Sequence, residues 1–398
     1  MDIRLGMIQM DIAKEARRFL NNECPLDYVR EMFEDDRGFT DDKWRKMVGM
    51  DWLGVRIPEE YGGMGMGQLD LNVVLEEMGR VLLPGPFLST AVLAAEAIMA
   101  GGSDSQKANI LPRIAAGEIK GTIALHERDG GSDPEYIRME ARPNGDGFML
   151  SGTKIGVLDA HVSDLMICAA LSQPGSDPLN GITLFVVNPK AKEVSVSLLP
   201  VMDGTRKMCA VEFKDLPLSR EDILGEVNTG WSFLEKVLQR VQVGLCAENV
   251  GGAQRAMEIA TSHAKSRVQF DKPIGAFQAI KHRCAEMYVD VECGRSISYW
   301  AAWAQDQADR NEASLAASVA KAYCAEMFRK VSTSAIQVLG ATGFSWDHDI
   351  HLYLKRAKVN EVLFGDPTYH RERIVRILTS GQTYRTERDA GHEVGLKH

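Results

Sequence analysis

The stretch DLMICAALSQPGSDPLNGITLFVV, residues 164–187, decides the fold class of this chain. Two apolar runs flank a segment that contains Pro174 and Gly175, a pattern typical of two strands joined by a turn. Further short runs of this kind occupy residues 121–125, 148–152, 194–202 and 209–218. About 100 residues of such runs, at a spacing of roughly ten residues, predict a sheet sandwich or barrel.

Helical periodicity precedes and follows these strands. Ile8, Ile12 and Ala16 recur at helical spacing before them. After Gly230, long segments carry apolar stripes wide enough for a bundle. These segments lie near residues 231–265, 278–308, 312–339 and 354–364.

We therefore expect an α+β fold that is mainly α. The expected parts are an N-terminal helical domain (1–120), a middle β-sandwich or β-barrel domain (121–228), a C-terminal four-helix bundle (229–380) and a polar tail (381–398).

Composition excludes several classes of protein. The chain has 398 residues, of which 45% are apolar and 25% charged, which is too apolar for a disordered protein. A net charge of −9 argues against nucleic acid as a partner. No run approaches the length of a membrane span, and the charged N-terminus is unlike a signal peptide. The seven cysteines form no CxxC pair, so we expect buried free thiols and a cytoplasmic location.

Taken one at a time, the polar motifs favour ordinary structural interpretations. Asp366-Pro367 is a good helix cap, and Gly340 suits a helix end. His348 and His351 lie one helical turn apart, but no other His or Cys cluster has matching spacing. We expect no metal site, and the glycines near Gly63 lack the context of a dinucleotide-binding strand and helix.

The order of four motifs, however, resembles the acyl-CoA dehydrogenase flavoprotein family over nearly the whole chain. The motifs are Ile57-Pro-Glu-Glu-Tyr-Gly-Gly63, Ala124-Leu…Gly131-Ser-Asp133, Arg267-x-Gln-Phe…Pro-Ile…Phe-Gln278 and Gln337-x-Leu-Gly-x-x-Gly-Phe344. The resemblance implies FAD bound between the β-domain and the bundle, and dimers or tetramers in which a neighbouring chain completes each FAD site.

The resemblance also implies cofactor-binding positions in two groups. Leu125, Gly131 and Ser132 would lie along the flavin and CoA, and Val157 and Leu158 occupy the flavin-flanking positions. In the second group, Arg267, Phe270, Gln337, Gly340 and Ala341 would contact the FAD of another chain. The further cofactor-binding positions of this group are Gln269, Phe277 and Gln278.

The chain departs from the family pattern where the catalytic base is expected. The family removes a thioester α-proton with a positioned Glu while a hydride moves to the flavin. That Glu position carries Gly365 here, and the alternative position falls at Val241-Gln242. Asp366 is the nearest acid and Glu248 the fallback. The flavin-flanking Trp position carries Gly156, which leaves space that suits a bulky acyl group or a site that holds no flavin.

Three hypotheses follow from the resemblance and its departures. The first is FAD-dependent dehydrogenation of a bulky, branched or polycyclic acyl-CoA, as in family members that degrade steroid side chains, with Asp366 as base. An electron-transfer flavoprotein or similar acceptor would take the electrons. The second is a non-catalytic subunit that completes the FAD site of a partner. The third is a flavin oxidase or monooxygenase reaction on the same fold.

Overall fold

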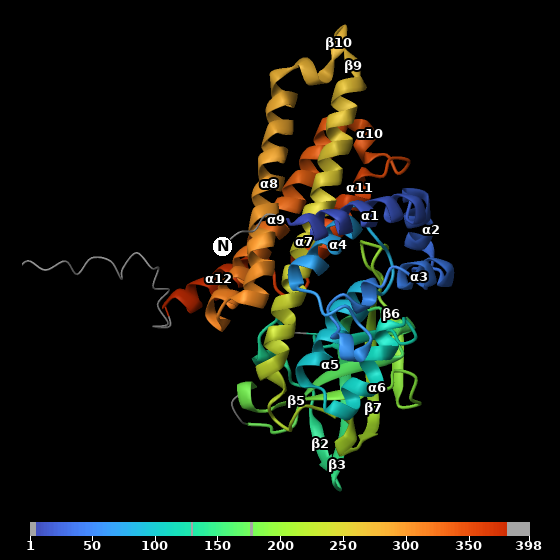
Figure 1. Ribbon diagram of the computed structural model, residues 1–398, viewed down its shortest axis with the longest axis vertical. Coiled ribbons are helices and arrows are strands. Elements are labelled where there is room, and N and C mark those ends of the chain that lie inside the picture. The colour runs from blue at the N-terminus through green and yellow to red at the C-terminus, as the bar shows by residue number, and fades with distance from the viewer. Residues whose placement is uncertain (1–4, 129, 176–177, 380–398) are drawn as a thin grey trace, which may run out of the picture.

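The computed structural model describes residues 5–128, 130–175 and 178–379, and the tail expected over 381–398 lies outside them. Figure 1 shows a long helical bundle, a β-domain at one end of it, and the N-terminal helices against its side. Helical, strand and helical regions follow one another in the expected order. The predicted α+β, mainly α fold class is confirmed.

The N-terminal helices lie against the bundle through a close helix crossing. A Cβ added to Gly79 would stand 2.1 Å from the Glu248 carbonyl oxygen, and one on Gly251 would stand 1.8 Å from the Glu76 carbonyl oxygen. Only glycine allows two helices to approach this closely. The N-terminal helices are α1 (Met7–Glu23), α2 (Leu26–Glu34), α3 (Asp41–Val48), α4 (Gln68–Arg80), α5 (Ala95–Gly101) and α6 (Asp104–Ala115).

The middle domain consists of two four-stranded sheets, in the orders β1-β4-β5-β8 and β2-β3-β7-β6. Strands were expected at six places, and each is found; β2 and β8 were not foreseen. The strands are β1 (Gly121–Ala124), β2 (Ala141–Asn144), β3 (Gly147–Leu158), β4 (Leu165–Leu171), β5 (Ile182–Val187), β6 (Val194–Leu198), β7 (Met208–Leu218) and β8 (Ile223–Leu224).

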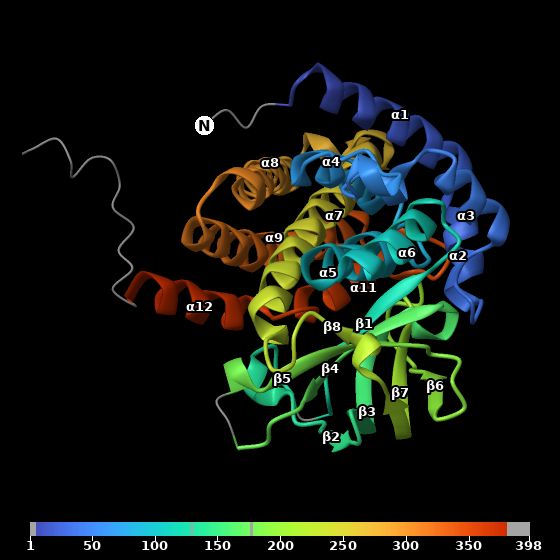
Figure 2. The same cartoon turned by 60° about the horizontal axis from the view of Figure 1, so that its bottom comes forward.

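The fully apolar run of β4 is explained by cores on both of its faces. Leu165 and Ile167 pack into the core shared with the helices. Met166 and Cys168, on the opposite face, pack into the core between the two sheets. Alternate residues of a strand point to opposite faces, so β4 must be apolar throughout. Figure 2 shows the strands below and the helices above.

The C-terminal bundle has the expected long helices, and α12 projects from it (Figures 1 and 2). The first helix ends at Ser266 rather than near Phe270, because the next residues form a short ribbon in which Phe270 and Asp271 have φ of 54° and 60°. The elements are α7 (Gly230–Ser266), β9 (Val268–Gln269), β10 (Lys272–Pro273), α8 (Gln278–Gln307), α9 (Arg310–Leu339), α10 (Ala341–Phe344), α11 (Ile350–Val362) and α12 (Pro367–Thr379).

The cysteines match the expectation of buried thiols only in part. Five are buried, but Cys284 is half-buried and Cys293 is exposed on α8, so the prediction is wrong for these two. All seven are free thiols. Among the described helices, none is both long and apolar enough to cross a bilayer.

Candidate functional site

The largest cavity near the predicted site lies where the β-domain meets the bundle. Its volume is about 470 Å³, and we call it the outer cavity. Its walls come from the loop after β1, the C-terminal part of β3, the start of β7 and the turn between α11 and α12. The lining residues are His126, Glu127, Arg128, Gly130, Gly131, Ser132, Ile155, Gly156, Met208, Val362, Leu363, Gly365, Asp366 and Tyr369.

A buried ion pair fixes the loop on one side of this cavity. The fully buried Lys154 donates from Nζ to Glu127 Oε1 at 2.6 Å and to the Leu125 carbonyl oxygen at 3.1 Å. Lys154 therefore connects β3 to the segment that carries the predicted Gly131 and Ser132. Because Gly156 has open space around its Cβ position, that part of the wall leaves room for a ring.

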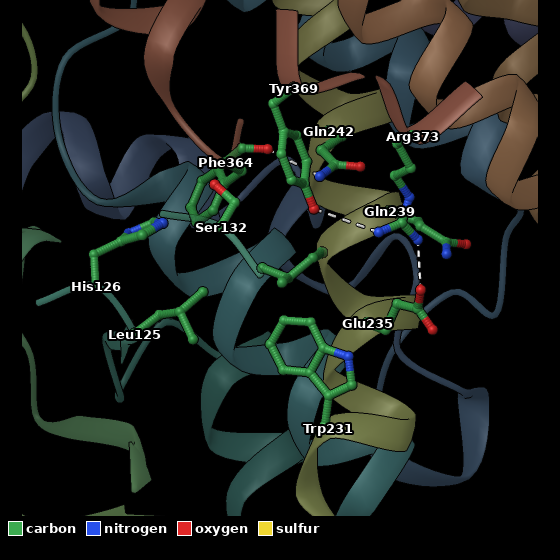
Figure 3. A pocket seen from close by; sticks show the side chains of 11 residues that line it. Leu125, His126, Ser132, Trp231, Glu235, Gln239, Gln242, Phe364, Tyr369 and Arg373 are labelled. Carbon is green, nitrogen blue, oxygen red and sulfur yellow. Dashed lines mark hydrogen bonds and ion pairs between the residues drawn. The ribbon is translucent and has the colours of Figure 1, made fainter. Parts of the chain in front are cut away.

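A second, nearly filled pocket lies deeper, between α7 and α12, and we call it the inner pocket. It has a volume of about 10 Å³, room for one water-sized group. Figure 3 shows the Tyr369 hydroxyl, Arg373 and Glu235 connected in a row across it. The lining residues are Leu125, His126, Ser132, Trp231, Glu235, Leu238, Gln239, Gln242, Phe364, Tyr369 and Arg373.

Tyr369 separates the inner pocket from the outer cavity. Its side chain lines both, and its hydroxyl donates to Asp133 Oδ1 at 2.9 Å. Burial raises the pKa of Tyr369 to about 12, so the phenol stays protonated. In this conformation Tyr369 ties α12 to the loop after β1, and an acyl group cannot pass inward unless the ring moves.

The turn between α11 and α12 cannot carry a side chain at the position where the resembling family has its Glu. Gly365 has φ of 101°. A Cβ there would stand 2.4 Å from Tyr369 Cδ1 and 2.8 Å from His370 Nε2. Both the backbone conformation and the space therefore select glycine.

Asp366 lies at the edge of the outer cavity and caps a helix. Its side chain is exposed, and Oδ1 accepts the Tyr369 backbone N–H at 2.8 Å. This bond satisfies one of the free donors at the start of α12. The structure thus gives Asp366 a capping role and a place beside the predicted site.

Glu248 is held away from both pockets by two guanidinium groups. Arg206 binds both of its carboxylate oxygens at 2.7 Å, and Arg356 binds Oε1. Burial alone would raise the pKa of Glu248, but the two arginines outweigh it and lower that pKa to about 2. A carboxylate with this environment is a poor proton acceptor, which argues against the fallback assignment of Glu248 as base.

In the first group of predicted cofactor residues, some line a pocket and others are buried in the hydrophobic cores. Leu125 lines the inner pocket, Gly131 the outer cavity, and Ser132 both. The side chains of Val157 and Leu158 are 1% and 2% exposed and pack in the two cores, so they do not face either pocket. The neighbouring Gly156 provides the wall instead.

The second group lies toward the opposite end of the bundle (Figure 1), where β9, β10 and α10 are found. One chain therefore does not bring the two groups together. Arg267 is exposed, and no carboxylate among the described residues pairs with it. Phe270, at the tip of the ribbon, is 85% exposed. The other members of this group also lie at this end; Gln269, Gln278, Gln337 and Ala341 are exposed, and Phe277 and Gly340 are half-buried.

These residues fit FAD shared between two chains. A free guanidinium suits a diphosphate, and an exposed phenyl ring suits the adenine. Gly340 has φ of 64° and no heavy atom within 4 Å of its Cβ position, so a ligand can approach the backbone there. Arg267, Phe270 and Gln337 would hold one part of the FAD, and Gly131, Ser132 and Gly156 of a neighbouring chain the other.

Sequence reasoning missed the polar residues that fill the inner pocket. Tyr369 and Arg373 are one helical turn apart on α12, and Glu235, Gln239 and Gln242 recur at helical spacing on α7. Polar side chains on one face of an otherwise apolar helix were the available signal.

The sequence predicted no metal site. Among the described residues, no group of three or more His, Cys, Asp or Glu side chains could hold a metal ion.

Two histidines with lowered pKa values, the buried His370 and the half-buried His126, predict acid sensitivity. Burial, followed by the charge of Lys154, lowers the pKa of His126 to about 4; burial, followed by Lys321, lowers that of His370 to about 3. The folded state keeps both neutral, whereas the unfolded chain protonates them near pH 6.5. The free energy of unfolding should therefore fall as the pH drops from 6.5 toward 4, and each histidine contributes about 1 kcal/mol per pH unit.

Urea denaturation at pH 7, 6 and 5 checks this expectation. His126→Phe keeps a ring beside Phe364, which lies 5.8 Å away between ring centroids, but removes the titration. The variant should lose less stability between pH 6 and 5 than the wild type. Equal losses would contradict a neutral His126 in the fold.

Comparison with known proteins identifies the class of protein that this fold and site define. Three family models match in order along the chain: the acyl-CoA dehydrogenase N-terminal domain at 8–118, the middle domain at 122–216 and the C-terminal domain at 228–379. The chain belongs to the acyl-CoA dehydrogenase family. These proteins are oxidoreductases that act on CH–CH bonds, with FAD as cofactor.

Individual relatives are similar over nearly the full length. A 3-(aryl)acrylate reductase of Clostridium sporogenes is 30% identical over 89% of this chain and 94% of its own. The ChsE4–ChsE5 complex of Mycobacterium tuberculosis contains a chain with 26% identity and a TM-score of 0.85, covering 95% of this chain and 99% of that one. A chain of a variant of the Tcur3481–Tcur3483 steroid ACAD has 28% identity and a TM-score of 0.84, with the same two coverages of 95% and 99%.

Proposed function

We propose that this chain is a subunit of a hetero-oligomeric, FAD-dependent acyl-CoA dehydrogenase in which a second, different chain supplies the base. The observation that carries the proposal is Gly365, whose conformation and surroundings exclude a side chain at the expected base position. The chain's contribution would be Arg267 and Phe270, which complete the FAD site of the partner.

The reaction of the family needs a carboxylate close to a thioester α-carbon. FAD accepts the hydride from the β-carbon when it is bound. The carboxylate must take the α-proton in the same site, and desolvation there raises its pKa toward the working pH. In this chain Glu248 has a lowered pKa and two arginine partners, and Asp366 is exposed and caps α12. Neither has the environment that this proton transfer requires.

The inner pocket also supports the proposal that the second chain, and not this one, carries out catalysis. Its volume of about 10 Å³ is much too small for an acyl chain, because Tyr369, Phe364 and Trp231 occupy the space. The exposed and unpaired end of the bundle, in contrast, has the groups that a dinucleotide needs. The inner pocket thus lacks room for an acyl chain and this chain lacks a base, but it retains the surface that completes a neighbour's site.

For the substrate of the assembly we propose a bulky, branched or polycyclic acyl-CoA. Two features support this class. Gly156 stands where the family has an aromatic residue, and the outer cavity has a volume of about 470 Å³. Similarity to chains of the ChsE4–ChsE5 complex and of a steroid ACAD adds to that support and to the hetero-oligomer. The acceptor would be an electron-transfer flavoprotein or a similar protein, as the family resemblance implies.

Purification with and without a partner tests the proposal. The chain produced alone should be colourless or aggregated and inactive. Co-produced with a family member that has Glu at the base position, it should give a yellow complex that dehydrogenates a polycyclic acyl-CoA faster than butyryl-CoA. A yellow homo-oligomer that dehydrogenates acyl-CoA without any partner would overturn the proposal. Oxygen consumption that depends on substrate and needs no acceptor protein would also overturn it, in favour of an oxidase or monooxygenase.

The homomeric alternative, with Asp366 as the base, is favoured by its place on the outer cavity. Asp366→Asn separates the two functions because Asn caps a helix as well as Asp but accepts no proton. Under our proposal the activity of the complex changes by no more than about twofold, as for other surface substitutions. A loss of about 100-fold or more would assign the base to Asp366.

A further inference from the structure

Lys321 is a buried cation beneath the turn that replaces the base-bearing segment. It lies in the middle of α9 and is fully buried. Its Nζ donates to the carbonyl oxygens of Asn360 at 3.0 Å, Glu361 at 3.2 Å and Gly365 at 2.9 Å. An ammonium group has three N–H donors, so every one of them is used.

Each of these three carbonyl groups needs a hydrogen-bond partner from outside α11. Asn360 and Glu361 belong to the last turn of α11, whose carbonyl oxygens have no partner within the helix and form its negative end. Gly365 lies in the turn just after it. Lys321 therefore joins the end of α11 to the turn from within α9.

The charge of Lys321 has no carboxylate partner among the described residues. A buried charge of this kind costs much free energy unless hydrogen bonds offset it. Three carbonyl oxygens require three N–H donors, which an ammonium group has and a neutral amide or hydroxyl group does not. The charged group therefore fixes the Gly365 carbonyl and the end of α11 at the same time.

Two neighbouring residues of this turn have left-handed backbone conformations. Phe364 has φ of 55° and Gly365 of 101°. The Phe364 carbonyl oxygen accepts from Gln242 Nε2 at 3.0 Å and His370 Nε2 at 3.2 Å. Side chains from α7, α9 and α12 thus hold two successive carbonyl groups of a strained segment.

We propose that Lys321 is a positioning residue, which holds the turn so that Gly365 and Asp366 form the wall of the outer cavity. Its loss would free the Gly365 carbonyl and the end of α11 together, and the wall would move. The role of the wall in receiving FAD and acyl-CoA rests on the proposed function. The positioning of the turn by Lys321 is independent of that function.

The charge environment gives a specific signature. The charge of the ammonium group is influenced by Cys246 from α7, Cys324 on α9, His370 from α12, Glu361 on α11 and Asp366 in the turn. Burial lowers the pKa of Lys321 to about 8. The ordered turn therefore releases the Lys321 proton near pH 8, whereas a lysine exposed by opening of the turn would keep its proton to about pH 10.4.

Hydrogen exchange in the assembled complex tests the proposal. Lys321→Met keeps the length and volume of the side chain but has no donor. Amides of residues 362–370 should exchange about tenfold faster in this variant, while α2 and α3 stay unchanged. FAD should dissociate about tenfold more readily. The control is Lys330→Met on the same helix, whose Nζ pairs with Asp290 at the surface at 2.8 Å, and it should alter neither measurement.

The wild-type protein supplies a second measurement that needs no variant. After correction for the ordinary pH dependence of exchange, protection of residues 362–370 should rise between pH 7 and 9, because an opened turn would have to take up the proton that the closed turn has released from Lys321. Unchanged exchange in this segment, or an equal change over the whole chain, would overturn the positioning role. A catalytically active homo-oligomer would refute the proposed function and leave this result intact.

Discussion

Arg356→Met is expected to lower the free energy of unfolding by about 3–5 kcal/mol, as for other buried ion pairs that lose one partner. Arg356 is almost fully buried on α11. It donates from Nε to Asp203 Oδ2 at 2.7 Å and also binds Glu248. Its removal leaves Glu248 with the guanidinium of Arg206 alone, and leaves the buried Asp203 carboxylate with hydrogen bonds from Thr205 but no ion pair among the described residues.

The same cluster joins two domains, so the loss of stability is not confined to the surroundings of Arg356. Asp203 and Arg206 lie in the connection between β6 and β7, whereas Glu248 and Arg356 come from α7 and α11. Loss of Arg356 should therefore weaken the contact between the β-domain and the bundle.

Urea denaturation at pH 7 measures the loss. The control is Arg371→Met, which removes a half-exposed pair with Glu326 and should cost about 0–1 kcal/mol. The double variant Arg356→Met with Glu248→Gln should cost less than the sum of the single changes, because one stranded charge is gone. A loss below about 1 kcal/mol for Arg356→Met would show that the cluster does not hold the domains together.

Arg267→Ala is expected to weaken FAD binding by the assembled complex by about 100-fold. The guanidinium is exposed and has no carboxylate partner among the described residues, so nothing in its own chain competes with a diphosphate. It begins the ribbon that displays Phe270 at its tip. Charge-assisted hydrogen bonds to phosphate contribute about 1.5–3 kcal/mol.

Titration of the apo-complex with FAD, followed by flavin fluorescence, gives the dissociation constant. Lys265→Ala provides a matched control, since Lys265 is also exposed at this end of α7. The control should change the affinity by less than about threefold, and the oligomeric state of both variants should match the wild type. An unchanged FAD affinity in Arg267→Ala would remove this chain from the cofactor site.

The sequence alone was sufficient for the fold class and the family, because both depend on patterns that run along the chain. The strand run at residues 164–171 and the long helical segments after Gly230 are local features of polarity and spacing. The departure at Gly365 and the candidate Arg267 could likewise be read directly. The end of α7 was placed too late, since the ribbon depends on two residues with positive φ that no apolar pattern indicates.

Only the tertiary structure decided what the acidic residues and buried cations do. Glu248 pairs with Arg206 and Arg356, which are 42 residues before it and 108 residues after it. Lys321 meets the Gly365 carbonyl, 44 residues away. A carboxylate has a pKa set by the charges and burial around it, and those are fixed when distant segments pack. The sequence determined which acidic groups the chain has, and packing determined that Asp366 serves as a helix cap and Glu248 as an ion-pair partner.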